Sequence, residues 1–168
     1  MTKLNPCNRR TFLKAAAAAS LSPAIIPASA FGARERPLPS DRITMGIIGT
    51  GGQGIDNMKQ FLRSRQVQVV AVCDVDAAHR DEARKLVNKM YANSDCTACN
   101  DFREITRRDD IDAVCIATPD HWHVLPALDA ARHGKDMYVQ KPLALTIREG
   151  RVLSDVVKET GRILQTGS

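Results

Sequence analysis

The chain has 168 residues, enough for one ordinary domain and a short appendage but not for two full domains. It is 43% hydrophobic and only 4% aromatic, a mixture typical of soluble α/β proteins. The formal net charge is +5, but four basic and no acidic residues fall in the first thirty positions, which leaves 20 basic against 19 acidic residues elsewhere. A nucleic-acid binder keeps a basic surplus and a membrane span needs a longer apolar run, so we expect neither a nucleic-acid partner nor a stable membrane anchor.

The amino-terminal segment has the layout of an export signal. Arg9 and Arg10 precede an alanine-rich apolar stretch, which is followed by Pro27 and by the small residues Ala28-Ser29-Ala30. A positive start, an apolar core and a small-x-small site are the parts of a secretory signal, in that order. Residues 8–14 also resemble the twin-arginine signature of bacteria.

We therefore expect a twin-arginine signal peptide over residues 1–30, with cleavage after Ala30 or, as a second candidate, after Ala33. A linker without stable structure is predicted over residues 31–41, which contain two prolines. This interpretation predicts export in the folded state to the periplasm or another extracytoplasmic space, with the twin-arginine machinery as a partner. The alternative is an ordinary amphipathic helix or a disordered tail.

From residue 42 onward, short apolar runs alternate with amphipathic stretches. The apolar runs predict strands over residues 43–49, 67–73, 111–117, 137–139 and 162–166. The amphipathic stretches predict helices over residues 55–65, 76–90, 123–132 and 146–161, and residues 91–102 are predicted as a loop with a short strand or turn at its end. Alternation of this kind favours a doubly wound parallel sheet, the Rossmann fold, over residues 42–168.

A glycine-rich turn lies between the first predicted strand and the first predicted helix. Gly49 permits a tight turn, Gly51 lets the backbone approach a pyrophosphate, and Gly54 lets the helix pack closely on the strand. The helix N-terminus then presents free N–H groups to the phosphates. The predicted phosphate-binding residues are Gly49, Thr50, Gly51, Gly52 and Gly54.

Asp74 is the feature that supports a dinucleotide cofactor. It lies twenty residues after Gly54, at the end of the second predicted strand, where a carboxylate accepts hydrogen bonds from the adenosine ribose hydroxyls and repels a 2′-phosphate. This favours NAD over NADP. Arg80 is close enough in the sequence to leave NADP as the less favoured alternative.

The second half of the chain carries the most specific text. Its landmarks are Thr118-Pro119-Asp120, His123, Gly134-Lys135 and Lys141-Pro142. With the glycine turn and Asp74, this pattern resembles the glucose–fructose oxidoreductase and inositol dehydrogenase (Gfo/Idh/MocA) family, and the resemblance covers nearly all of residues 42–168.

The resemblance implies roles for several residues. Thr118, Pro119 and Asp120 would pass the nicotinamide half of the cofactor, and His123 would start the following helix near it. Lys141 would reach the nicotinamide ribose and the substrate hydroxyl, where a cation lowers the pKa of an alcohol that loses hydride. The chain departs from the family at Gln140, where members have Glu. A neutral amide positions a neighbour by hydrogen bonds but does not hold the lysine by charge.

The remaining metal-ligating and redox residue types do not predict a metal site. His121 and His123 flank Trp122 without a third ligand nearby, so we interpret His121 as a rim residue that faces substrate. Cys73 and Cys115 fall within predicted buried strands and are interpreted as core residues. Cys96 and Cys99 form a C-x-x-C that we interpret as incidental loop cysteines, since a redox dithiol or a zinc site needs further features.

Three functions stay open from the sequence. Family members carry a second α/β domain, absent from this chain, that mediates oligomerisation and builds much of the substrate pocket, so the full-length protein is expected to be a homo-oligomer. The first function is an oxidoreductase on a sugar or polyol hydroxyl with a tightly bound, internally recycled cofactor. The second is an NAD-dependent glycosidase or lyase that oxidises the sugar transiently. The third is a non-catalytic nucleotide-binding fragment.

Overall fold

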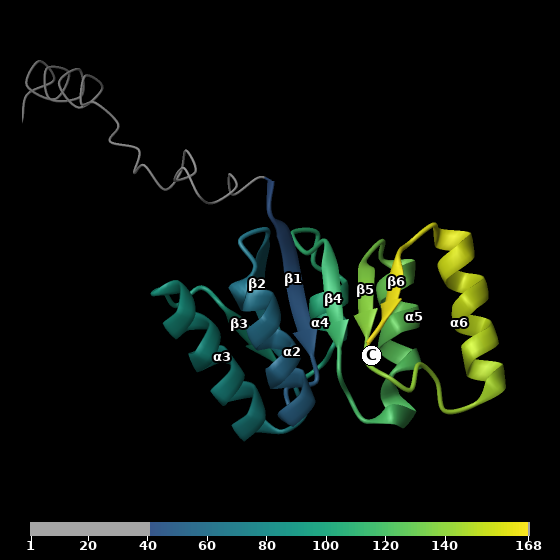
Figure 1. Cartoon of the computed structure of the whole chain (residues 1–168), viewed down its shortest axis with the longest axis horizontal. Coiled ribbons are helices and arrows are strands. Elements are labelled where there is room, and N and C mark those ends of the chain that lie inside the picture. The colour runs from purple at the N-terminus through teal and green to yellow at the C-terminus, as the bar shows by residue number, and fades with distance from the viewer. Residues whose placement is uncertain (1–40, 168) are drawn as a thin grey trace, which may run out of the picture.

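Strands and helices alternate along the part of the chain that the structure, a computed structural model, describes: residues 41–167 (Figure 1). The predicted signal peptide and all but the last residue of the predicted linker lie outside these residues. The strands are β1 Ile43–Ile48, β2 Val67–Cys73, β3 Thr97–Cys99, β4 Ala113–Ile116, β5 Asp136–Val139 and β6 Leu164–Thr166. The helices are α2 Gly52–Arg63, α3 Ala77–Tyr91, α4 Arg103–Thr106, the 3₁₀ turn η3 Asp120–Trp122, α5 Val124–Arg132 and α6 Ile147–Thr160.

The six strands form one parallel sheet in the order β3-β2-β1-β4-β5-β6. The chain first winds outward from β1 to β3, crosses back to β4, and then winds outward in the opposite direction to β6. This is the order of the doubly wound dinucleotide-binding fold, so the predicted fold class is confirmed. The direction reverses between β1 and β4, and ligands bind in such folds outside the carboxyl ends of the strands at that point.

Each face of the sheet has its own hydrophobic core. One cluster gathers buried residues of α2 and α3 around Ile47, and the other gathers residues of α4, α5 and α6 around Ile48. Consecutive strand residues point to opposite faces, which is why these neighbours belong to different clusters. Figure 1 shows α2 and α3 on one side of the sheet. The strands predicted from the sequence are almost continuously apolar because helices cover both faces of the sheet.

Helix ends follow local signals in the sequence. The Asp76 carboxylate caps α3 by accepting hydrogen bonds from the N–H groups of Ala78 and His79. At α6, Thr146 and Glu149 form the predicted capping box in both directions. Helix α2 begins at Gly52, three residues before its predicted start, because the glycine turn itself supplies the first turn of the helix.

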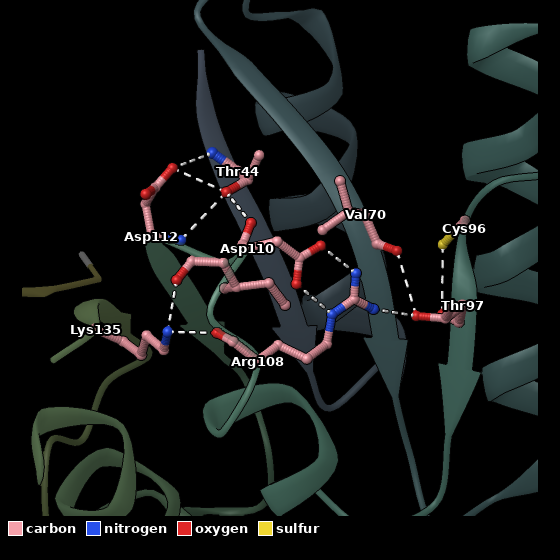
Figure 2. A network of polar contacts seen from close by, with 9 residues as sticks. Thr44, Val70, Cys96, Thr97, Arg108, Asp110, Asp112 and Lys135 are labelled. Carbon is pink, nitrogen blue, oxygen red and sulfur yellow. Dashed lines mark hydrogen bonds and ion pairs between the residues drawn. The ribbon is translucent and has the colours of Figure 1, made fainter. Parts of the chain in front are cut away.

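The amino ends of the strands are joined by a polar network, shown in Figure 2. The side chains of this network are Thr44, Thr97, Arg108, Asp110, Asp112 and Lys135. Lys135 is 6% exposed, and its Nζ donates to the main-chain oxygens of Arg108 (2.5 Å) and Ile111 (2.8 Å). The Gly-Lys pattern noted in the sequence thus places a buried cation that satisfies the carbonyls of the turn before β4.

Arg108 extends the same network across the sheet. Its guanidinium donates to both carboxylate oxygens of Asp110 and to the Thr97 hydroxyl, which ties the turn to β3. This pairing raises the pKa of Arg108 and holds the pKa of Asp110 below its usual value. Thr44 at the start of β1 exchanges hydrogen bonds with Asp112 through both backbone and side chain. The amino ends of β1, β3 and β4 are therefore fixed relative to one another.

Candidate cofactor site

A cavity of about 700 Å³ opens at the carboxyl ends of β1, β2, β3 and β4. Its size lies within the range of small-molecule and cofactor sites. The residues that line it are Ile48, Gly49, Gly51, Gly52, Gln53, Cys73, Asp74, Val75, Asp76, His79, Asn100, Asp101, Phe102, Arg103, Ala117, Thr118, Pro119, His121, Trp122 and Pro126. The strand ends point to the lower edge of the sheet in Figure 1, so the cavity occupies the position that the topology predicts for a ligand.

The glycine turn meets the requirements expected of each of its glycines. Gly49 has φ +88°, and a Cβ there would lie 2.6 Å from the carbonyl of Ala117. At Gly54 a Cβ would overlap the carbonyl oxygen of Gly49. At Gly51 and Gly52 a Cβ would meet nothing within 4 Å. Packing therefore requires glycine at positions 49 and 54, whereas Gly51 and Gly52 leave open space on the cavity side of the turn.

Asp74 holds the turn from the neighbouring strand. Its Oδ2 accepts from the Thr50 N–H at 2.7 Å and from the Thr50 hydroxyl at 3.2 Å. Its Oδ1 accepts from the Asp76 N–H at 2.9 Å. A carboxylate offers about four acceptor positions, so capacity remains for a ribose hydroxyl. Thr50 is 1% exposed and supports Asp74, without lining the cavity itself.

Arg80 is engaged behind Asp74. Its Nη1 donates to the main-chain oxygen of Asp74 at 2.7 Å and to Oδ1 of Asn100 at 3.3 Å. Arg80 is not among the cavity residues. The cation that kept NADP open as an alternative is therefore used to connect the ends of β2 and β3.

One wall of the cavity was missed by sequence reasoning. Asn100, Asp101, Phe102 and Arg103 follow β3, and the guanidinium of Arg103 lies over the Phe102 ring at 4.7 Å. The sequence predicts only a loop with a short strand or turn at its end over residues 91–102, because β3 has only three residues and α4 only four. The signal available was topological: the carboxyl end of the strand beside β2 must border the same crevice.

The second wall follows β4. Thr118 and Pro119 line the cavity as predicted, and the buried Thr118 hydroxyl has no hydrogen-bond partner within residues 41–167. His121, interpreted from the sequence as a rim residue, also lines the cavity, together with Trp122. Asp120 is exposed at the start of η3 and is not among the lining residues.

His123 has a different role in the structure from direct contact with a ligand. It is 1% exposed, and its ring nitrogens lie 2.8 Å (Nε2) from the Thr118 oxygen and 2.6 Å (Nδ1) from the Pro142 oxygen. The imidazole thus joins the loop after β4 to the loop after β5. Because both nitrogens face main-chain carbonyls, His123 contributes to the site by holding these two loops together.

Gln140 and Lys141 continue this second loop. Gln140 is 8% exposed, and its Oε1 accepts from the backbone N–H of Lys141 at 2.8 Å. The Lys141-Pro142 bond is cis. Lys141 is exposed, and its ammonium has no hydrogen-bond or ion-pair partner within the described range 41–167. Neither residue lines the cavity.

The register of the sheet places Lys141 next to the cavity wall. Ile116 of β4 pairs with Val139 of β5, and the Gln140 N–H donates to the Ile116 oxygen at 2.9 Å. Thr118 and Lys141 each stand two residues beyond this pair, on adjacent parallel strands. Of the predicted residues, the structure therefore gathers Gly49, Gly51, Gly52, Asp74, Thr118 and Pro119 around the cavity, and places Thr50, Gly54, Asp120, His123, Gln140 and Lys141 behind it or on its rim.

Other residue clusters do not add a metal or a membrane element to the part of the chain that is described. Within residues 41–167 no group of three or more His, Cys, Asp or Glu side chains is placed to hold a metal ion. No helix in the same range has the length and apolarity to cross a membrane. Cys73 and Cys115 are buried core residues, as predicted. Cys96 lies in the loop before β3, as predicted, but is buried, whereas Cys99 lies within β3 and not in a loop.

Comparison with known proteins agrees with this geometry. Residues 43–168 match the Gfo/Idh/MocA family, described as an oxidoreductase family with an NAD-binding Rossmann fold. The chain belongs to this family. Among solved Gfo/Idh/MocA-like structures, scyllo-inositol dehydrogenase from Lactobacillus casei superposes with a TM-score of 0.67 at 25% identity, covering 76% of this chain and 37% of that one. A second structure of that enzyme, with bound NAD(H) and scyllo-inositol, gives the same TM-score and identity.

Curated relatives are more similar in sequence. A glycosyl hydrolase family 109 protein of Shewanella baltica is 33% identical over 91% of this chain. An alpha-N-acetylgalactosaminidase of Shewanella oneidensis is 34% identical over the same share. The chain spans only 37% of the length of each. The matched 91% of this chain is longer than residues 43–168, so the similarity includes the NAD-binding portion and also part of the segment before residue 43.

The residues present fit NAD. The open space beside Gly51 and Gly52 would let a pyrophosphate approach the turn, and α2 begins there, at Gly52, without a side-chain cap at its N-terminus. Asp74 keeps acceptor capacity for a ribose hydroxyl, and the buried Thr118 hydroxyl is a polar group that lacks a partner on the opposite wall. The cavity thus fits NAD, the cofactor of the family to which this domain belongs.

Proposed function

We propose that this protein is an NAD-dependent oxidoreductase that acts on a hydroxyl group of a sugar or polyol and retains its cofactor through the catalytic cycle. The observation that carries the proposal is the position of Lys141. Lys141 lies two residues beyond Val139 of β5, as Thr118 of the cavity wall lies two residues beyond its register partner Ile116 of β4, and its ammonium has no partner within residues 41–167. A cation there is suited to bind the hydroxyl from which hydride leaves.

Each neighbour of Lys141 has a defined task in this proposal. Gln140 fixes the backbone of Lys141 through its N–H, and His123 fixes the following residue, Pro142, against the Thr118 loop. Bound NAD supplies the hydride acceptor. Lys141 would donate a hydrogen bond to the substrate oxygen, which lowers the pKa of the hydroxyl and favours loss of its proton to water, and the resulting alkoxide is the form from which hydride can leave. Because Gln140 is neutral, the ammonium is not held by a carboxylate at that position.

Export is the second part of the proposal. The twin-arginine pattern of residues 8–14 supports transport of the protein already folded, so NAD can be bound in the cytoplasm and carried along. In the periplasm there is no obvious pool of free NAD with which to exchange. An exported enzyme therefore returns its cofactor to the starting redox state within each cycle, with a second substrate or a later step of the same reaction.

A second candidate function is favoured by the curated relatives. Two of them are named as a family 109 glycosyl hydrolase and an alpha-N-acetylgalactosaminidase. The same Lys141 geometry serves a glycosidase that oxidises the sugar transiently, eliminates the neighbouring substituent and then reduces the product. In both candidates the net consumption of NAD is zero, but only the glycosidase releases an aglycone.

The deciding experiment uses the full-length protein purified from the periplasm. Its bound nicotinamide is measured by absorbance, and single sugars, polyols and nitrophenyl N-acetylgalactosaminides are then added in turn. A change in nicotinamide absorbance on addition of a sugar or polyol, without release of nitrophenol, supports the oxidoreductase. Release of nitrophenol without net change in absorbance supports the glycosidase. Bound NAD that responds to none of these compounds would leave a non-catalytic nucleotide-binding protein.

The role of Lys141 is tested by Lys141→Met. We expect hydride transfer to fall about a hundredfold or more, while the affinity for NAD changes by less than about threefold, because Lys141 does not line the cavity. Lys158→Met removes another exposed lysine, in the last turn of α6, and serves as the matched control. Full activity of Lys141→Met would contradict the assignment.

A further inference from the structure

Two cysteines are neighbours on β2 and β3, the strands that lead into Asp74 and into the cavity wall formed by residues 100–103. Cys73 ends β2 and Cys99 ends β3, and they are register partners on these parallel strands. Neighbouring strands lie about 4.8 Å apart, within the Cα separation of about 4.4–6.8 Å that a disulfide spans. Both cysteines are reduced in the structure.

The side chains of this pair point to the same face of the sheet. Cys73 belongs to the core cluster beneath α5, and Cys99 packs against that cluster. Cys96 belongs to the cluster on the opposite face. The C-x-x-C motif therefore does not form a pair of its own: the three-residue spacing in extended backbone sends its two thiols to opposite faces, and Cys99 meets Cys73 instead.

The two thiols are chemically unequal. The interaction between the two thiols lowers the pKa of Cys99 and, together with burial, raises the pKa of Cys73, while the Cys99 Sγ donates to the Val72 oxygen at 3.7 Å. Cys73 is 3% exposed, whereas Cys99 is partly exposed. Cys99 is thus the thiol that an external reagent meets first, with Cys73 placed to resolve the product. Cys96 belongs to the core cluster on the opposite face of the sheet, so its thiol is not placed to resolve a mixed disulfide at Cys99.

The backbone at both cysteines supports the NAD site. The Cys73 oxygen accepts from the Gly49 N–H at 2.8 Å, and the Cys99 oxygen accepts from the Asp74 N–H at 3.3 Å. Cys73 also lines the cavity. Contraction of the two sulfurs to a covalent S–S bond of about 2.05 Å would therefore shift the strand ends that position the glycine turn and Asp74.

We propose that Cys73 and Cys99 form a thiol–disulfide site beneath the NAD cavity, which closes by exchange with an external disulfide and which weakens NAD binding when closed. The Cys99 thiolate attacks a disulfide R–S–S–R, forming a mixed disulfide and releasing one thiolate. Cys73 then loses its proton and attacks the Cys99 sulfur, which releases the second thiolate. Two cysteine thiols are oxidised and one external disulfide is reduced to two thiols.

The test treats the full chain with oxidised glutathione and maps its disulfides by mass spectrometry without reduction. Trypsin places Cys73 in the peptide 66–80 and both Cys96 and Cys99 in the peptide 90–103, so fragmentation of the linked pair assigns the partner. We expect a Cys73–Cys99 link. We also expect the Kd for NAD, measured by calorimetry, to be at least about fivefold higher in the oxidised than in the reduced protein.

Matched variants separate this site from general oxidation. Cys96→Ser should keep both the link and the fivefold difference. Cys99→Ser should bind NAD equally before and after oxidation, because the difference is taken within one variant and does not depend on its basal affinity. A Cys96–Cys99 link, a glutathione adduct at Cys99 that does not resolve, or a Cys73–Cys99 link without change in NAD affinity would each overturn the proposal.

Discussion

The two ends of the sheet are built on opposite principles. At the amino ends, Lys135 and Arg108 saturate main-chain and side-chain acceptors in a closed network (Figure 2). At the carboxyl ends, the Thr118 hydroxyl lacks a partner, the space beside Gly51 is open, and the Lys141 ammonium has no partner within residues 41–167. Polar groups that are satisfied internally stabilise the fold, whereas polar groups left unsatisfied at a cavity are available to a ligand. Substitutions at the two ends should therefore separate stability from binding.

The largest loss of stability is expected at Gly54, which is tightly packed against the backbone of the glycine turn at the carboxyl ends of the strands. Gly54→Val places a side chain onto the carbonyl of Gly49, so the strand and helix must move apart. We expect the free energy of unfolding to fall by about 3 kcal/mol or more, together with loss of measurable NAD binding. Urea denaturation and calorimetric titration measure the two effects.

Gly51→Ala is the matched control for that substitution. Its Cβ meets nothing within 4 Å, so the unfolding free energy should change by less than about 1 kcal/mol, while NAD affinity falls because the methyl group occupies the approach of the pyrophosphate. Equal destabilisation by Gly51→Ala and Gly54→Val would show that the turn is not divided in this way.

Lys135→Met tests the amino end. The substitution leaves the main-chain oxygens of Arg108 and Ile111 without their charged donor, in a position where water has little access. We expect a loss of about 2–3 kcal/mol of unfolding free energy, with the Kd for NAD within about twofold for the protein that remains folded. A large loss of NAD affinity with unchanged stability would break the distinction between the two ends.

Asp74→Asn tests the carboxyl ends of the strands, and we expect a smaller effect than for the glycine and lysine substitutions above. An amide has one oxygen to accept hydrogen bonds, so it cannot serve the N–H groups of Thr50 and Asp76 in the same manner as the carboxylate does. We expect the Kd for NAD to rise about tenfold, or about 1.4 kcal/mol, and a smaller change in stability. Isothermal titration against NAD and NADP in parallel measures the first effect.

The smallest expected effect is on the loss of stability at low pH. Backbone hydrogen bonds from Ala78 and His79 lower the pKa of Asp76, and the Arg108 guanidinium lowers the pKa of Asp110. A carboxyl group with a lowered pKa in the folded state contributes stability above its ordinary pKa of about 4, and this contribution is lost as the pH falls through the lowered pKa. Asp76→Asn keeps a helix cap at neutral pH but should reduce the drop in the urea midpoint between about pH 7 and pH 3.

How much could be predicted from the sequence depended on the length of each signal. The doubly wound fold class followed from the alternation of apolar runs and amphipathic stretches, and a cofactor site was expected from Gly49, Gly54 and Asp74, whose spacing has a physical reason. The wall after β3 was missed because a strand of three residues has no detectable period. The pairing of Cys99 with Cys73 could not be predicted either, since a shift of one residue in the bounds of β3 would have sent Cys99 to the other face.

His123 shows a third kind of limit. Its pattern in the sequence indicated proximity to the cofactor, and the structure places it near the site, but its partners are main-chain oxygens of residues 118 and 142. A carbonyl oxygen leaves no trace in an amino-acid sequence, because every residue has one. Contacts of this kind become visible only in three dimensions.

Lys135 also makes its contacts with main-chain oxygens, and this constrains how the protein can evolve. Its ammonium binds main-chain oxygens at positions 108 and 111, which any amino acid at those positions would still provide. For this contact, homologues are free to exchange the side chains of the turn, but an insertion or deletion between the end of α4 and the start of β4 would move the oxygens out of reach. In an alignment, the lysine should therefore accompany a turn of constant length rather than a turn of constant composition.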